Sequence, residues 1–192
     1  GMRPIKLKFF ELTKLPNLKN LTIRISLDHY EKKFHEKIRG KNTWSQLIEN
    51  ISWLSNNRFN INIASKIKAF EKERDLRKSF QGFFNRLKIN INAYDKESLV
   101  LFPIMNTENP ATEITQECWT KLNKNPNEIM CSSSRMVVKK KEEENTKILA
   151  CTLITKDKSF ELGNSLTSSE KKVFLNHPYC SQFCVLGNSS CS

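Results

Sequence analysis

Five cysteines in the last third of the chain have spacings that suit a soft metal. Cys180, Cys184 and Cys191 fall within one short C-terminal segment, and Cys131 and Cys151 precede it. Thiolates on short bending segments can point toward one centre, either a zinc ion or an iron–sulfur cluster. Buried free thiols and disulfides are the alternatives, because cysteine also packs as a small hydrophobic residue. These five residues are therefore the predicted metal ligands.

The other residues that could bind a metal are fewer. His177 lies three residues before Cys180 and is a possible further ligand, because imidazole suits zinc. Cys118, beside Trp119, is expected to be packed, with ligation as the alternative, and His29 and His35 are predicted to be loop and surface residues. No serine–histidine–aspartate pattern, phosphate-binding loop or carboxylate pair stands out, so the sequence offers no candidate catalytic residue.

Composition limits the class of protein. The chain has 192 residues, of which 38% are hydrophobic, enough for one domain or for one domain with a small appendage. No stretch is apolar for long enough to cross a membrane, and no signal peptide is recognisable. We therefore expect a cytoplasmic protein, and a reducing compartment favours metal binding over disulfides.

The net charge of +12 raises the question of a nucleic-acid partner. Lysine is abundant, whereas arginine, which contacts phosphates with two parallel hydrogen bonds, is scarce. The lysines are also spread along the chain and are not gathered in one basic run. Nucleic-acid binding is therefore kept as an alternative and is not the favoured interpretation.

Residues 1–105 have the pattern of an α/β domain. Apolar residues alternate over 21–27 and recur over 59–64 and 99–104, which predicts three strands. Helical spacing predicts one helix that begins at Asn42 or Thr43 and ends near residue 57, and another over 71–86. Strands that alternate with helices indicate successive βαβ crossovers and therefore a parallel sheet.

Residues 106–192 differ in character and are predicted to form a second, Cys-rich region. Residues 113–122 suit a short helix. Residues 135–140 and 147–153 flank a charged turn and predict a β-hairpin. A turn at 163–166 follows, and after it comes the Cys-rich tail.

The first region resembles the middle of the barrel of radical S-adenosylmethionine enzymes. The resemblance rests on Leu-Thr-Ile-Arg-Ile-Ser-Leu-Asp-His from residue 21, an Arg-Gly turn at Arg39, a helix, and Phe-Asn-Ile-Asn-Ile-Ala-Ser from residue 59. It implies a partial parallel (β/α) barrel of about three strands. It also implies that Ser26 and Arg39 contact the S-adenosylmethionine carboxylate in the parent enzyme; in this chain alone, a strand-end hydroxyl and a surface arginine are the favoured alternative. Asp28 is expected to have a structural role, either capping the loop or orienting Arg39.

The second region resembles the SPASM/Twitch extension of the same enzymes, in which cysteines around a hairpin bind an auxiliary iron–sulfur cluster of the 4Fe–4S type. The matching elements are Cys131, the hairpin, Cys151, the Leu-Gly-Asn-Ser-Leu turn from residue 162, and Cys180, Cys184 and Cys191. The ending Cys-Val-Leu-Gly-Asn-Ser-Ser-Cys-Ser is similar to that of a bacterial branch of the family.

One departure from the family concerns catalysis. The Cys-x3-Cys-x2-Cys loop that binds the catalytic cluster is absent from this sequence. The chain thus resembles the C-terminal half of a radical S-adenosylmethionine oxidoreductase without its N-terminal half, and it is expected not to cleave S-adenosylmethionine. The alternatives from other classes are a small structural zinc-binding module without catalysis and a basic nucleic-acid-binding protein.

A half-barrel also predicts self-association. The strand at 21–27 would have an unpaired edge, and the side chains expected to face the barrel interior would lack an opposite wall: Ile23, Ile25, Ile61, Ile63 and Leu101. A second copy could cover both as a homodimer. Alternatively, residues 4–15 could fold back over the edge.

Overall fold

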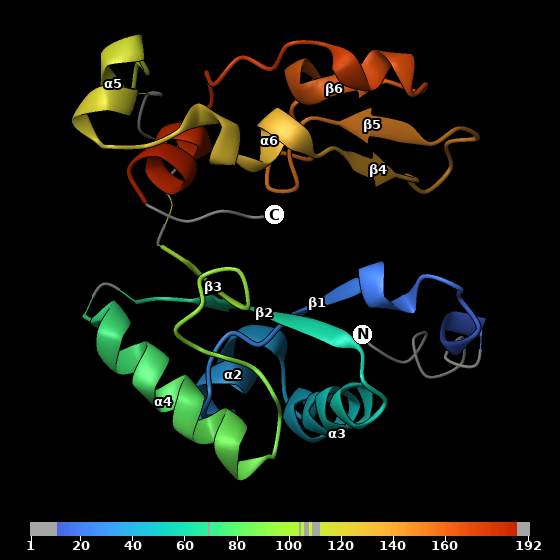
Figure 1. The fold of residues 1–192 in the computed structure, drawn as a ribbon, viewed down its shortest axis with the longest axis vertical. Coiled ribbons are helices and arrows are strands. Elements are labelled where there is room, and N and C mark those ends of the chain that lie inside the picture. Colours follow the sequence, from blue (N-terminus) through green and yellow to red (C-terminus); the bar gives the residue numbers. More distant parts are fainter. Residues whose placement is uncertain (1–10, 69, 104, 106–107, 109–111, 188–192) are drawn as a thin grey trace. The chain divides into compact units, whose positions relative to one another are not determined.

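The chain divides into two compact units, Gly1–Ile104 and Met105–Ser192. The structure is a computed structural model and describes residues 11–68, 70–103, 105, 108 and 112–187. Each unit has a sheet of its own (Figure 1) and a hydrophobic core of its own.

The first unit contains a parallel sheet of three strands in sequential order: β1 (Thr22–Ser26), β2 (Asn60–Lys66) and β3 (Leu99–Phe102). Ile23 pairs with Ile61 across β1 and β2, and Ile63 pairs with Leu99 across β2 and β3. The predicted α/β class and parallel sheet are therefore confirmed. Within the described residues the sheet does not close into a barrel.

Three helices cover one face of this sheet (Figure 1): α2 (Lys32–Arg39), α3 (Thr43–Asn56) and α4 (Glu73–Arg86). α3 and α4 agree with the sequence prediction, whereas α2 was not predicted.

α2 ends at Gly40, whose φ of +98° suits glycine. Asn42 is the N-cap residue of α3 but makes no capping hydrogen bond, and the Thr43 hydroxyl donates to the Gly40 carbonyl at 2.7 Å.

The two faces of the sheet differ in polarity. Ile25, Ile61, Ile63 and Leu101 are buried in the helix-side core, and Ile23 packs against it half-buried. The prediction that these five side chains face a barrel interior was wrong, because the helices that cross between the strands cover their face. The opposite face is polar on β1 and β2, where it carries Thr22, Arg24, Ser26, Asn60, Asn62 and Lys66, but it also carries Ala64 and, on β3, Val100 and Phe102.

The second unit is built on an antiparallel sheet of β4 (Met136–Val138), β5 (Lys147–Leu149) and β6 (Glu161–Gly163). β4 and β5 are the predicted hairpin, whereas β6 was not predicted. Two short helices, α5 (Gln116–Lys121) and α6 (Met130–Ser133), precede the sheet, and a π-helical segment, η5 (Cys180–Val185), follows it. The 3₁₀ turns within the described residues are η1 (Leu18–Asn20), η2 (Pro126–Glu128), η3 (Lys158–Phe160) and η4 (Thr167–Glu170).

Two further expectations can be compared with this fold. None of the helices in the described part of the chain is long and apolar enough to cross a membrane. Of the segment 4–15, residues 4–10 lie outside the described residues, and Leu12 packs against the core of the first unit.

Two glycines are expected to respond to alanine with opposite signs. Gly163 has a φ of +141°, and a Cβ there would lie 2.7 Å from the Ser168 hydroxyl oxygen, so Gly163→Ala should destabilise the second unit by about 1–3 kcal/mol. Gly82 lies inside α4 with open space around its Cβ position, so Gly82→Ala should stabilise the first unit by about 0.5–1 kcal/mol. Thermal unfolding measures both, and an unchanged transition for Gly163→Ala would contradict the geometry at this turn.

Candidate metal centre

Four of the five predicted ligands line one pocket of the second unit. Cys131 lies on α6, Cys151 lies two residues after β5, and Cys180 and Cys184 lie in η5. The structure therefore brings together thiols that are up to 53 positions apart in the sequence (184 − 131). Cys191 lies outside the described residues.

Local structure explains how each segment presents its cysteine. The Ala150 N–H donates to the Phe160 carbonyl at 2.9 Å, which fixes the chain immediately before Cys151. In η5 the Leu186 N–H donates to the Ser181 carbonyl at 2.8 Å, the five-residue spacing of a π-helix. Cys180 and Cys184 are four residues apart in η5, and that spacing places their side chains on nearly the same face of a helix.

The pocket is small and apolar. Its volume is about 20 Å³. Hydrophobic side chains surround the thiols, among them Ile154, Phe160 and Leu175. None of the described residues that line the pocket is acidic or basic. Thiolate sulfur in such surroundings is the donor type that selects zinc or iron–sulfur clusters over hard cations.

The apolar surroundings of the pocket keep the Cys180 thiol in its neutral form. Burial raises the pKa of the Cys180 thiol to about 11, and the neighbouring thiols of Cys151 and Cys131 act in the same direction. A thiol with this pKa is protonated at neutral pH unless a metal replaces the proton. The Cys151 sulfur accepts a hydrogen bond of 3.3 Å from the Leu153 N–H.

The four sulfurs do not yet form a closed ligand set. In the part of the chain that the structure describes, no three histidine, cysteine, aspartate or glutamate side chains are arranged to hold a metal ion. Ligation therefore requires the thiol side chains to turn toward one centre in the pocket. Three of the four cysteines are half-buried, and Cys180 is buried.

Of the two further candidate ligands, His177 adjoins the pocket, because its ring contacts Phe160 and Tyr179, which line it. His177 Nδ1 accepts a hydrogen bond from the Tyr179 N–H at 3.1 Å, and the ring packs edge-on against Phe160. Cys118 is half-buried on α5, and the Thr115 hydroxyl and backbone N–H lower the pKa of its thiol. Neither residue is among those that line the pocket.

Ser26 and Arg39 are the two residues predicted to contact a carboxylate at the carboxyl end of β1. Ser26 is the exposed last residue of the strand, and Arg39 closes α2. The Arg39 Nε and one Nη donate to the carboxylate of Asp28, which is 3% exposed. This ion pair supports the expectation that Asp28 orients Arg39.

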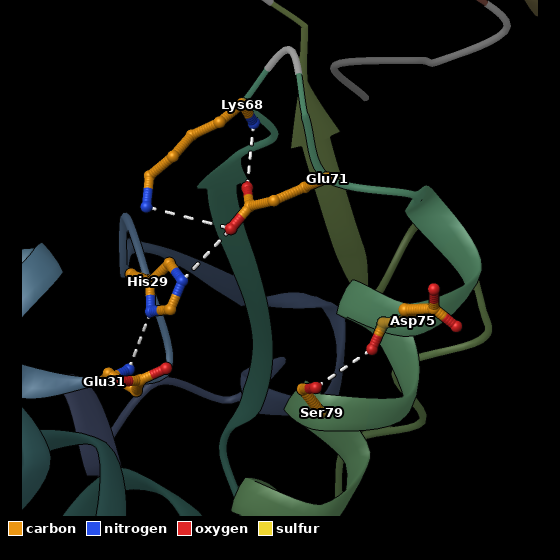
Figure 2. Close-up of polar contacts among 6 residues, drawn as sticks. All are labelled: His29, Glu31, Lys68, Glu71, Asp75 and Ser79. Atoms are coloured by element: carbon orange, nitrogen blue, oxygen red, sulfur yellow. Dashed lines mark hydrogen bonds and ion pairs between the residues drawn. The ribbon is translucent and has the colours of Figure 1, made fainter.

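Beside this pair lies a polar network that the sequence did not reveal (Figure 2). The Glu31 N–H donates to His29 Nδ1 at 2.9 Å, so Nε2 carries the ring proton and donates to Glu71 Oε1 at 3.3 Å. The Lys68 N–H donates to the other Glu71 oxygen at 2.9 Å. The Lys68 ammonium lies 3.7 Å from the centre of the Phe34 ring. Both imidazole nitrogens are engaged, so His29 joins the loops after β1 and β2 and is not a free base.

The predicted surface exposure of His29 and His35 was wrong, although His29 does lie in a loop. Both side chains are buried, at 2% and 1% exposure. The cause is α2, which was not predicted and which buries His35 against Trp44, with ring centres 5.6 Å apart. A signal for this helix was present, since Lys37 and Arg39 precede Gly40 in the pattern of a helix C-terminus.

Comparison with known proteins gives no family assignment. No model of a protein family, no curated protein and no solved structure matches this chain. The function must therefore be inferred from the chain's own residues, and the thiol-lined pocket is the arrangement with the clearest chemistry.

Proposed function

We propose that the second unit binds a thiolate-ligated metal centre, specifically an auxiliary iron–sulfur cluster, on a scaffold related to radical S-adenosylmethionine oxidoreductases. The observation that carries the proposal is the gathering of Cys131, Cys151, Cys180 and Cys184 around one apolar pocket. Buried thiols that fill space have no need to meet from three separate segments of the chain. When bound, the cluster would supply electron transfer, and the chain's own residues would hold it and exclude water.

The topology of the first unit also supports a scaffold related to radical S-adenosylmethionine oxidoreductases. Its strands are parallel and in sequential order, and its helices lie on one face of the sheet (Figure 1). Doubly wound sheets place helices on both faces, whereas the strands of a (β/α) barrel have theirs on the outside. We interpret the sheet as part of such a barrel, with Ser26 and Arg39 positioned for a carboxylate at the carboxyl end of β1.

This proposal does not include catalysis by the chain itself. Reductive cleavage of S-adenosylmethionine needs an electron from a cluster that binds the cofactor directly, and the Cys-x3-Cys-x2-Cys loop for that cluster is absent from the sequence. The proposed role of the second unit is therefore to hold an accessory redox centre.

A single zinc ion is the second candidate, and the size of the pocket favours it. A volume of about 20 Å³ is room for roughly one small ion or water molecule. Four thiolates also satisfy the tetrahedral coordination of structural zinc. The site would then stabilise the second unit without redox chemistry.

Metal analysis after anaerobic expression separates the two candidates. Iron with inorganic sulfide and a brown colour would support the cluster. Zinc in a colourless protein would support the structural site. A chain that contains neither metal, and that takes up neither on anaerobic reconstitution, would refute both.

The homodimer remains a prediction and concerns the first unit. Among the described residues, β1 pairs on one side only, with β2, so its other side can accept a strand. Ile25, Ile61 and Ile63 cannot add apolar surface to a dimer interface, because the helices of the first unit cover them. We expect sedimentation at micromolar concentration to give a dimer of the 22.4 kDa chain. A monomer under these conditions would show that the edge is covered in another way.

A further inference from the structure

Two basic side chains contact the backbone of the cysteines that line the pocket. The Arg135 guanidinium donates through one Nη to the Cys131 carbonyl at 2.6 Å. The Lys124 ammonium donates to the Cys184 carbonyl at 2.8 Å. The two cations come from different segments, one just before β4 and one after α5, and each reaches a different cysteine.

The charge of Arg135 is not neutralised by an acid. Its other contacts are also carbonyl oxygens: Ser134 at 2.8 Å, Ser169 at 2.7 Å and, more weakly, Lys171 at 3.5 Å. None of the described carboxylates forms an ion pair with it. The guanidinium is therefore half-buried among carbonyl oxygens, and one of these oxygens belongs to Cys131, which lines the pocket.

A thiolate centre would need this charge. Four thiolates around a divalent ion leave a net charge of about −2, and the described lining of the pocket contains no cationic side chain to offset it. The pocket is apolar, and a charge in apolar surroundings is screened less than in water. A cation just behind the ligand backbone is therefore well placed to stabilise the metal-bound state.

We propose that Arg135, assisted by Lys124, is the countercharge of an anionic thiolate–metal centre. The inference rests on the proposed function but holds for zinc and for a cluster alike. Arg135 is a positioning residue and not a ligand, since it touches a ligand carbonyl and no sulfur. The alternative role is a purely structural clamp, because the same guanidinium also joins the Cys131 segment to residues 169 and 171.

Cobalt(II) binding by the full chain under anaerobic conditions tests the proposal, since thiolate-to-cobalt absorption reports ligation directly. Arg135→Gln should weaken cobalt affinity about 10-fold or more, the size of effect that residues behind metal ligands typically have. Arg135→Lys keeps the charge but cannot form the several-carbonyl clamp, so it should restore affinity to within about 3-fold of the unchanged chain. Lys141→Gln, at a side chain that is 93% exposed, removes the same charge from the hairpin tip and should have no effect.

Each outcome decides between a countercharge and a clamp. If Arg135→Lys is as weak as Arg135→Gln, the residue acts as a clamp and the countercharge proposal is wrong. If Arg135→Gln does not fold, Lys124→Gln replaces it, and cobalt affinity equal to that of Lys141→Gln would overturn the proposal. If the unchanged chain gives no thiolate–cobalt absorption, the proposed function fails and this inference fails with it.

Discussion

Replacing Cys180 with serine should weaken metal binding about 100-fold. Structural zinc sites with four ligands contribute about 10–16 kcal/mol, so one ligand accounts for roughly 3 kcal/mol. Cys180 is the most buried of the four pocket thiols, and a serine hydroxyl there would be a poor ligand for a soft metal. Competition with a chromophoric chelator measures the affinity. Cys131→Ser and Cys151→Ser should have similar effects, because both thiols line the same pocket.

Cys118→Ser is the matched control, since it makes the same chemical change at a cysteine on α5, away from the pocket lining. Its metal affinity should equal that of the unchanged chain. Equal losses in Cys118→Ser and Cys180→Ser would mean that the metal binds to accessible thiols in general. In that case the pocket would not be the site.

Acid should destabilise the first unit between pH 7 and pH 5. Burial lowers the pKa of His29, helped by Lys68, and burial also lowers the pKa of His35, helped by Arg39. The unfolded chain takes up protons near pH 6.5, whereas the folded unit keeps both rings neutral to lower pH. Stability is therefore complete above about pH 6.5 and falls below it, by at most about 1.4 kcal/mol per pH unit for each histidine.

Urea unfolding followed by tryptophan fluorescence at several pH values measures this slope. The double variant His29→Gln with His35→Gln should be less stable at pH 7 but nearly independent of pH down to pH 5. Carboxylates with lowered pKa, such as Asp95, change protonation only below this range, so they do not interfere. An unchanged chain whose stability is flat from pH 7 to pH 5 would show that the rings are not held neutral by folding.

Much of the fold could be predicted because its signals are local. The alternation of β2 and the helical spacing of α3 and α4 are visible in single segments, and each segment buries its apolar side as expected. α2 was missed because its eight residues are mostly charged and its buried members include a histidine. The face of the sheet that is buried was assigned incorrectly, because alternation shows which residues share a face but not which layer covers it.

The candidate site was predictable in part. Cysteine spacing identified the thiols, since the packing of a core does not by itself require five of them near one end of the chain. The contacts of Lys124 and Arg135 with ligand carbonyls were not predictable, because they join residues 60 and 4 positions apart through backbone oxygens that any sequence possesses. The His29–Glu71 contact, 42 positions apart, depends in the same way on how two loops meet.

The alternation of β2 has a consequence for assembly. Asn60 and Asn62 face away from the helices, whereas Ile61, Ile63 and Ser65 face them. A slip of one residue in register would turn the asparagine amides into the core and the isoleucines outward, at a cost of several kcal/mol. β1 alternates in the same way, with Ile23 and Ile25 on the helix side and Arg24 on the other. Any strand that joins β1 must therefore match this two-sided pattern, so the edge selects its partner by side-chain alternation as well as by backbone hydrogen bonds.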